Sequence, residues 1–131
     1  MDTTRSNNRL IRRMAEEDRA RLAPYFEERE FAFKQTLFEQ DGPISHVYFP
    51  DIGVISLVSI LTGGEVIETG TVGPEGLAGL PLVLGVARAS ARAICQVPGK
   101  GWSLPASVVV EERSRSSAWF RLLLRYANYV N

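Results

Sequence analysis

The sequence predicts an α+β domain in which a roll of about eight antiparallel strands lies between two helical segments. Apolar residues recur at helical spacing before residue 28, alternate with polar residues in short runs from 29 to 104, and return to helical spacing from 105. Glycine and proline separate the alternating runs at close intervals, which is typical of a sandwich or a barrel-like roll. We therefore divide the chain into an N-terminal helical segment (1–28), a β-roll domain (29–104) and C-terminal helices (105–131).

The composition is that of one globular domain. The 131 residues are 45% apolar, which excludes a disordered chain, and no apolar run is long enough to span a membrane. Cys95 is the only cysteine, so we expect no disulfide framework and a cytoplasmic location. Lys and Arg together number 15, as do Asp and Glu. Because a domain that holds DNA by itself is usually basic, we do not expect this segment to contact DNA.

The N-terminal segment predicts one or two short helices between about Asn8 and Glu28. The apolar residues with helical spacing are Leu10, Ile11, Met14 and Leu22. Pro24 closes the pattern, because proline disrupts the hydrogen bonding of a helix interior.

Alternating runs then predict the strands of the roll. The longest run is Val54–Leu61, and a hairpin turn at Thr62-Gly63-Gly64-Glu65 leads from it into Val66–Val72. The later runs interpreted as strands are Leu80–Gly85 and Ala89–Val97. The pairs and triplets interpreted as turns are Gly42-Pro43, Asp51-Ile52-Gly53 and Pro98-Gly99.

The stretch Glu65–Pro81 carries glycines at 70, 73, 76 and 79, and the chain is organised around it. Glycine permits positive φ angles and close approach of the backbone to another group. One interpretation is a cradle for an anion, in which successive N–H groups converge on the ligand. The other is a tight corner between strands that binds nothing.

The C-terminal segment predicts two helices. The first covers Ser107–Arg113 after Pro105, and the second covers residues 118–131 with Ser116 or Ser117 as its N-terminal cap. One face of the second helix is apolar and contains Trp119, Leu122, Leu123, Tyr126 and Val130. This face packs either on its own domain or against the same helix of a second copy. Because no C-cap follows, we expect the intact protein to continue beyond Asn131.

The residue types of the sequence give little support for catalysis or for metal binding. A metal-dependent enzyme of the cupin type needs several converging imidazoles and carboxylates, whereas His46 is the only histidine. Cys95 has no thiol partner and lies in an apolar run, as an inert core thiol does. The acidic residues near the turns are dispersed. We therefore expect no catalytic residue, no metal ligand and no enzymatic activity.

The order of these elements resembles the cyclic-nucleotide-binding domain, and in particular the sensor half of Crp/Fnr-type bacterial transcription regulators. The likeness extends over roughly residues 9–131. The stretches that carry it are Gly42–Pro50, Gly53–Val58, Val72–Pro81 and Gln96–Gly99.

The resemblance implies an antiparallel double-stranded β-helix, a cupin-like jelly roll, that senses a small effector. It implies a homodimer paired through the C-terminal helix, with Trp119, Leu122, Leu123, Tyr126 and Val130 at the seam. It also implies a DNA-binding helix-turn-helix domain that would follow residue 131, and no membrane partner. A two-fold dimer suits a palindromic operator.

The effector implied by the resemblance is a cyclic nucleotide (cAMP or cGMP) or another small molecule. The pocket residues it suggests are Gly73, Gly76, Leu77, Arg88, Ala89 and Ser90. Members of the family that bind cAMP place a glutamate after the glycine, where it accepts from the ribose hydroxyl, and an arginine on the cyclic phosphate. This sequence has Leu77 where that glutamate is expected, so its nucleotide pocket is degenerate. Arg88 is either a phosphate ligand or a surface charge.

Three functions follow from these observations. The first is an effector-sensing and dimerising domain of a transcription regulator. The second is a ligand-free module for dimerisation and partner docking, supported by the missing glutamate. The third is a cupin-like enzyme, which the residue types of the sequence support least.

Overall fold

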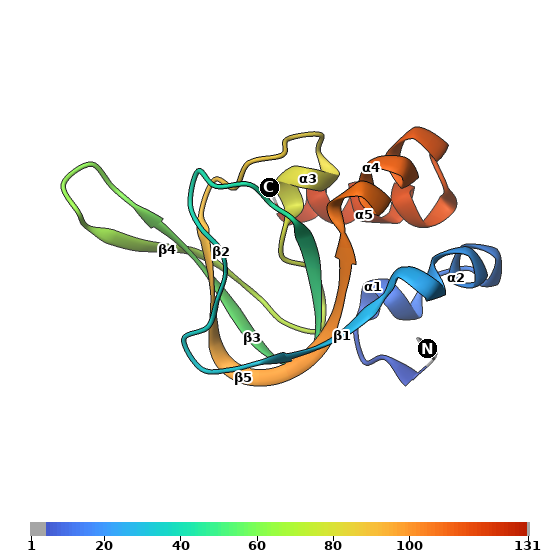
Figure 1. Ribbon diagram of the computed structural model, residues 1–131, viewed down its shortest axis with the longest axis horizontal. Helices are drawn as coiled ribbons and strands as arrows, with labels where there is room; N and C mark the ends of the chain where they lie inside the picture. The colour runs from blue at the N-terminus through green and yellow to red at the C-terminus, as the bar shows by residue number, and fades with distance from the viewer. Residues whose placement is uncertain (1–4, 131) are drawn as a thin grey trace.

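The computed structural model describes residues 5–130, in which helices precede and follow the strands in chain order (Figure 1). The helices are α1 (Arg9–Arg12), α2 (Glu16–Leu22), the short 3₁₀ helix η2 (Ala23–Tyr25), α3 (Leu80–Val83), α4 (Ala106–Arg115) and α5 (Ala118–Val130). The strands are β1 (Glu27–Phe31), β2 (Thr36–Phe38), β3 (His46–Ile60), β4 (Val66–Val72) and β5 (Arg92–Pro105). The α+β class expected from the sequence is confirmed.

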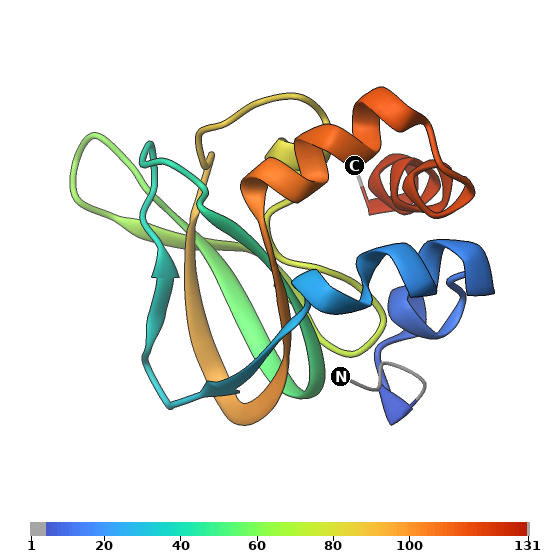
Figure 2. The same cartoon turned by 45° about the vertical axis from the view of Figure 1, so that its right-hand side comes forward.

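All strand pairs are antiparallel, in the order β1-β5-β3-β4, and β2 also pairs with β5. The sheet curves strongly, and the helices from the two ends of the chain gather on one side of it (Figures 1 and 2). The hairpin that joins β3 to β4 projects on the opposite side. Apolar side chains from strands and helices form one core cluster.

The described residues contain five strands, whereas the sequence analysis expected about eight. The turns expected at Asp51-Ile52-Gly53 and Pro98-Gly99 are wrong, because both segments lie inside the long strands β3 and β5. Gly53 has a φ of 104°, and a Cβ there would lie 2.6 Å from the carbonyl oxygen of Val97. The glycines therefore let two backbones pass closely at a bulge, so the paired strands bend without ending.

The segment Leu80–Gly85, expected as a strand, instead begins with helix α3. Pro81 occupies the first turn of this helix, where its missing N–H costs nothing, and the adjacent side chains of Leu82 and Val83 are both buried. The next strand, β5, begins at Arg92 and not at Ala89. Ala89 instead pairs with the turn at Gly42 through its backbone N–H (2.9 Å).

The hairpin turn after β3, strand β4 and the cap of α5 are confirmed. The hairpin turn closes where Leu61 N–H donates to the carbonyl of Glu65 (2.8 Å), and β4 covers Val66–Val72. Ser117 caps α5, because its Oγ accepts from the N–H of Phe120 (3.1 Å). Asn131 lies outside the described residues.

A buried polar network ties α2 to the corner between α4 and α5. Arg21 contacts Glu112 with two nitrogens (Nη2–Oε1 2.6 Å, Nε–Oε2 3.1 Å), and Ser117 donates to the same carboxylate (2.8 Å). Asp18 pairs with Arg21 and accepts from the backbone N–H of Trp119 (3.0 Å). The hydrogen bond with Glu112 is the main cause of an Arg21 pKa above its ordinary value. Charge pairing thus holds helices from the two ends of the chain together.

Trp119 and Leu123, expected at a dimer seam, pack into the core of their own chain, where they are 2% and 1% exposed. The indole nitrogen of Trp119 donates to the carbonyl of Leu10 (2.7 Å), and its ring packs against Phe26 and Phe49. These two side chains are therefore buried within their own chain and do not form the expected dimer seam.

Asn8 is fully buried and connects α1 to two other parts of the chain. Its Oδ1 caps α1 by accepting from the N–H groups of Leu10 and Ile11. Its Nδ2 donates to the carbonyls of Pro50 in β3 (2.9 Å) and Gly76 (2.8 Å). One amide therefore fixes the start of the helix, the sheet and the glycine-rich stretch relative to each other.

We expect Asn8→Ala to lower the free energy of unfolding by on the order of 2–4 kcal/mol, because it removes a helix cap and leaves buried carbonyls unpaired. Urea unfolding measures this loss. The exposed Asn128 in α5 provides the matched control, since Asn128→Ala should change stability by less than about 0.5 kcal/mol. Equal effects of the two substitutions would contradict the connecting role of Asn8.

Candidate functional site

A cavity of about 670 Å³ opens between the sheet, the glycine-rich stretch and α5. This volume lies within the range of roughly 300–1,000 Å³ that is usual for small-molecule sites. The residues that line it are Phe38, Asp41, Leu57, Thr69, Gly70, Thr71, Val72, Leu77, Gly79, Leu80, Pro81, Leu84, Val86, Arg88, Ala89, Ser90, Ala91, Tyr126 and Val130. They come from β2, the β2–β3 loop, β3, β4, α3 and the loops on either side of it, and α5.

Four of the six pocket residues expected from the sequence line this cavity: Leu77, Arg88, Ala89 and Ser90. Leu77 and Ala89 are buried, whereas Arg88 and Ser90 are exposed at the rim. Gly73 and Gly76 are buried but do not line the cavity. Gly76 lies against Asn8 of the N-terminal segment and Tyr126 of α5, whereas Gly73 lies against Glu75 and Gly53.

Three backbone N–H groups of the glycine-rich cassette (residues 72–81) donate to other groups of the chain. Gly73 N–H donates to Oε1 of Glu75 (3.0 Å), and Gly76 N–H donates to the carbonyl of Gly73 (3.1 Å). Ala78 N–H donates to the carbonyl of Tyr48 (2.8 Å). Because these three donors already have partners within the chain, this part of the cassette forms a corner and not the anion cradle that the glycine spacing suggested as one alternative.

Arg88 is positioned by its neighbours at the rim of the cavity. The backbone around it pairs with the turn at residues 41–44, and its Nη1 donates to the carbonyl of Asp41. Among residues 5–130, no carboxylate lies within ion-pair distance of Arg88. The guanidinium is thus anchored by one donor and keeps the others for solvent or a ligand.

Tyr126 brings α5 to the cassette and to the cavity. Its phenol lies so close to Gly76 that a Cβ on this glycine would overlap the ring and the hydroxyl. Burial raises the pKa of Tyr126, and a hydrogen bond with the backbone of Leu77 opposes this shift. The side chain of Tyr126 therefore connects the cavity wall, the cassette and the C-terminal helix.

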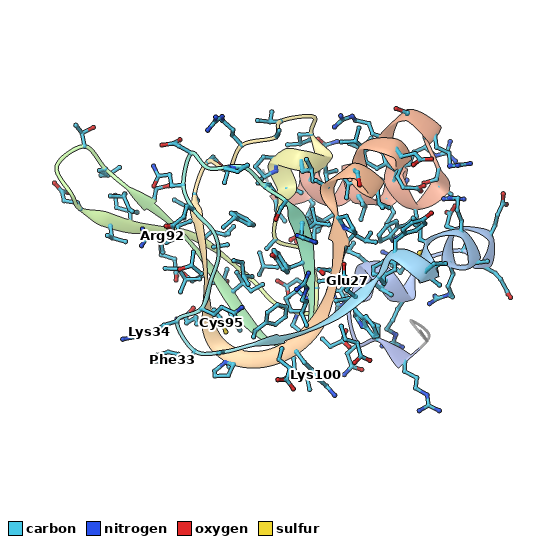
Figure 3. The ribbon with its side chains drawn as sticks, in the orientation of Figure 1. Glu27, Phe33, Lys34, Arg92, Cys95 and Lys100 are labelled. Atoms are coloured by element: carbon cyan, nitrogen blue, oxygen red, sulfur yellow. The ribbon has the colours of Figure 1, made fainter. Side chains whose placement is uncertain are left out.

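The described residues hold no group of three or more His, Cys, Asp or Glu side chains placed to bind a metal ion. Cys95 is buried in β5, where its thiol contacts the carbonyl of Val97 (3.3 Å) and burial raises its pKa. It lies beside the bend that carries Phe33 and Lys34, and Lys34 N–H donates to its carbonyl (Figure 3). In the described part of the chain, no helix is long and apolar enough to cross a membrane.

Comparison with solved structures identifies the fold as that of cyclic-nucleotide-binding-like domains. A proposed cyclic-nucleotide-binding protein from Geobacter metallireducens GS-15 aligns with 94% of this chain and 89% of its own, at 14% identity and a TM-score of 0.77. The N-terminal domain of a transcriptional regulator from Streptomyces coelicolor A3(2) aligns with 98% of this chain and 88% of its own, at 20% identity and a TM-score of 0.68.

The catabolite activator protein of Thermus thermophilus aligns with 89% of this chain at 20% identity and a TM-score of 0.70. This chain covers only 55% of that protein. All three structures are described as binding or regulatory proteins. No family model and no curated sequence matches the chain.

Sequence reasoning missed most of the apolar wall. Phe38, Leu57 and Leu80 face the cavity from three separate elements, and nothing local in the sequence separates them from ordinary core residues. Tyr126 was expected at a dimer seam and instead contacts the cassette. The signal for a site in the sequence was the four glycines between residues 65 and 81, because a glycine backbone can approach another group closely.

We expect Gly76→Ala to destabilise the domain by about 1–3 kcal/mol, because its methyl group would overlap Tyr126. Adding Tyr126→Ala should recover part of this loss, with a coupling of roughly 0.5–3 kcal/mol in a double-mutant cycle. Gly70→Ala is the control, since a Cβ there meets no atom within 4 Å. Additive effects of the Gly76 and Tyr126 substitutions would contradict the contact.

Proposed function

We propose that this chain is the effector-sensing and dimerising part of a Crp/Fnr-type transcription regulator. The observation that carries the proposal is the cavity of about 670 Å³ whose wall includes both the cassette and α5. A ligand that fits this cavity better in one arrangement of α5 than in another shifts the protein toward that arrangement by its differential affinity. The similarity to the Streptomyces regulator domain and to the catabolite activator protein supports this function.

The pocket is degenerate with respect to cyclic nucleotides. Leu77 is 2% exposed and offers no acceptor where the resemblance requires one for the ribose hydroxyl. Glu75, the nearest acid in the cassette, bonds to Gly73 N–H and does not line the cavity. The effector is therefore either a cyclic nucleotide (cAMP or cGMP) recognised without the usual glutamate or another small molecule.

The proposed dimer pairs two copies of α5 through its outward face. Leu122 is half-buried and packs partly on its own core, and Val130 is 48% exposed although it also borders the cavity. Tyr129, which the sequence analysis did not select, is 89% exposed and lies two helical turns after Leu122. DNA binding would belong to a helix-turn-helix domain outside the given sequence, in keeping with the zero net charge of this domain. A regulator of this kind works in the cytoplasm.

The second candidate is a ligand-free module for dimerisation and partner docking. Two observations favour it: the buried Leu77 and the cassette N–H groups that already have partners within the chain. In this case the cavity is a packing feature, and small molecules leave stability unchanged.

Thermal unfolding against cAMP, cGMP and small carboxylates tests the sensing function. A ligand at a hundred times its dissociation constant adds about 2.7 kcal/mol, which raises Tm by roughly 4 °C or more. Gly70→Leu should retain the fold and abolish this rise, because Gly70 shares the inward face of β4 with Val72 and a Cβ there meets open space. A flat response to every compound would favour the ligand-free module.

Sedimentation equilibrium tests the dimer. The wild-type domain should have about twice its chain mass of 14.5 kDa, and Leu122→Glu should reduce it to the monomer by placing a charge in the seam. Asn128→Glu introduces the same charge on an exposed position of another face and should leave the dimer intact. An unchanged mass for Leu122→Glu would show that the chain does not pair through this face.

A further inference from the structure

We propose that the effector is a small amphipathic monoanion, with one carboxylate-like head and an apolar body, and not a nucleotide. This inference rests on the sensing function proposed above and names the class of its ligand. It follows from the distribution of apolar and charged side chains around the cavity.

The wall of the cavity is apolar over most of its extent. Phe38 from β2, Leu57 from β3 and Val72 from β4 contribute one side, and Leu77 and Leu80 contribute the cassette side. Such a surface binds a hydrocarbon or planar apolar body through the hydrophobic effect. A sugar placed against it would lose hydrogen bonds to water and find few replacements, which costs binding free energy.

The polar groups around the cavity offer little to a ribose or a cyclic phosphate. Thr69 already donates its hydroxyl to the carbonyl of Leu57 (3.2 Å). The cassette N–H groups of Gly73, Gly76 and Ala78 are bonded within the chain, so they do not form a phosphate cradle. Besides Arg88, Asp41 and Thr69, the polar side chains of the lining are the hydroxyls of Thr71, Ser90 and Tyr126, and no cassette carboxylate joins them to accept from a ribose.

Two charged side chains, Arg88 and Asp41, line the cavity. The guanidinium of Arg88 is held on the carbonyl of Asp41 and has no carboxylate partner among residues 5–130. It is the one cation at the cavity in the described chain, so it can pair with a single anionic head. The charge of Asp41 at the same rim disfavours a ligand with two negative charges.

Leu84 and Val86 extend the apolar wall to the surface on the same loop that carries Arg88. They are 47% and 53% exposed. Leu84 and Val86 thus lie on the same loop as the Arg88 guanidinium, which has no carboxylate partner among residues 5–130. This arrangement suits a ligand whose anionic head lies at the rim of the cavity and whose apolar body lies along its wall.

Isothermal titration with octanoate, the neutral analogue octanamide and cAMP tests this inference on the chain as it exists. Octanoate should bind more tightly than octanamide, and Arg88→Gln should weaken octanoate by about tenfold or more through loss of a charge-assisted bond. Leu84→Asp, at an exposed position of the wall, should weaken both compounds. Arg121→Gln in α5 removes an exposed arginine that does not line the cavity and should change neither affinity.

Each outcome decides the inference. Equal octanoate affinity in Arg88→Gln and the wild type would overturn the anionic head, and unchanged binding in Gly70→Leu would place the ligand outside the cavity. Binding of cAMP without binding of octanoate would overturn the ligand class and leave the sensing function intact. Binding of neither compound would overturn the inference, and a flat response to the wider set of nucleotides and carboxylates would remove the sensing function as well.

Discussion

The structure depends on how the cassette is held between groups from the two ends of the chain. The buried amide of Asn8 donates to the carbonyl of Gly76, and the phenol of Tyr126 lies against the same glycine from α5. Neither contact tolerates much displacement, because an unpaired buried carbonyl and an overlapped methyl group each cost free energy. The cassette therefore couples the cavity wall at Leu77 to both helical segments.

The proposed difference between this cavity and a nucleotide site rests on local hydrogen bonding. In the cassette, Glu75 turns back to the N–H of Gly73, and the hydrogen bond from Ala78 joins the cassette to Tyr48 in β3. The same bonds that make this corner rigid leave its donors unavailable to an anion. In the proposed sensor, charge recognition belongs to Arg88 on another loop, where the guanidinium is exposed and donates to the backbone carbonyl of Asp41. The cassette and Arg88 thus both border the same largely apolar cavity.

The elements governed by local chemistry could be predicted from the sequence. The cap at Ser117, the hairpin at residues 62–65 and the helical spacing near both ends each depend on a few neighbouring residues. The predicted number of strands was too high, because Gly53 marks a bend between two closely passing backbones and such a bend has the same sequence signal as a turn.

Leu77 and Arg88 could be placed at the cavity from the order of the motifs, whereas Phe38 and Leu57 reach the cavity only through the tertiary fold. The apolar face of α5 could not reveal its partner, since Trp119 would satisfy the same pattern in a dimer or in its own core.

The network of Asp18, Arg21 and Glu112 has a consequence for synthesis of the chain. Helix α2 is made early, yet its charged partners lie about ninety residues later, at the corner before α5. Contacts of such large sequence separation form late, because a long loop must close before they stabilise the fold. On the ribosome, the contacts of α2 with Glu112 and Trp119 cannot form until these two residues have emerged. A nascent chain that lacks α5 therefore also lacks the indole that bonds to Leu10 and packs against Phe26, so it leaves part of the N-terminal core uncovered.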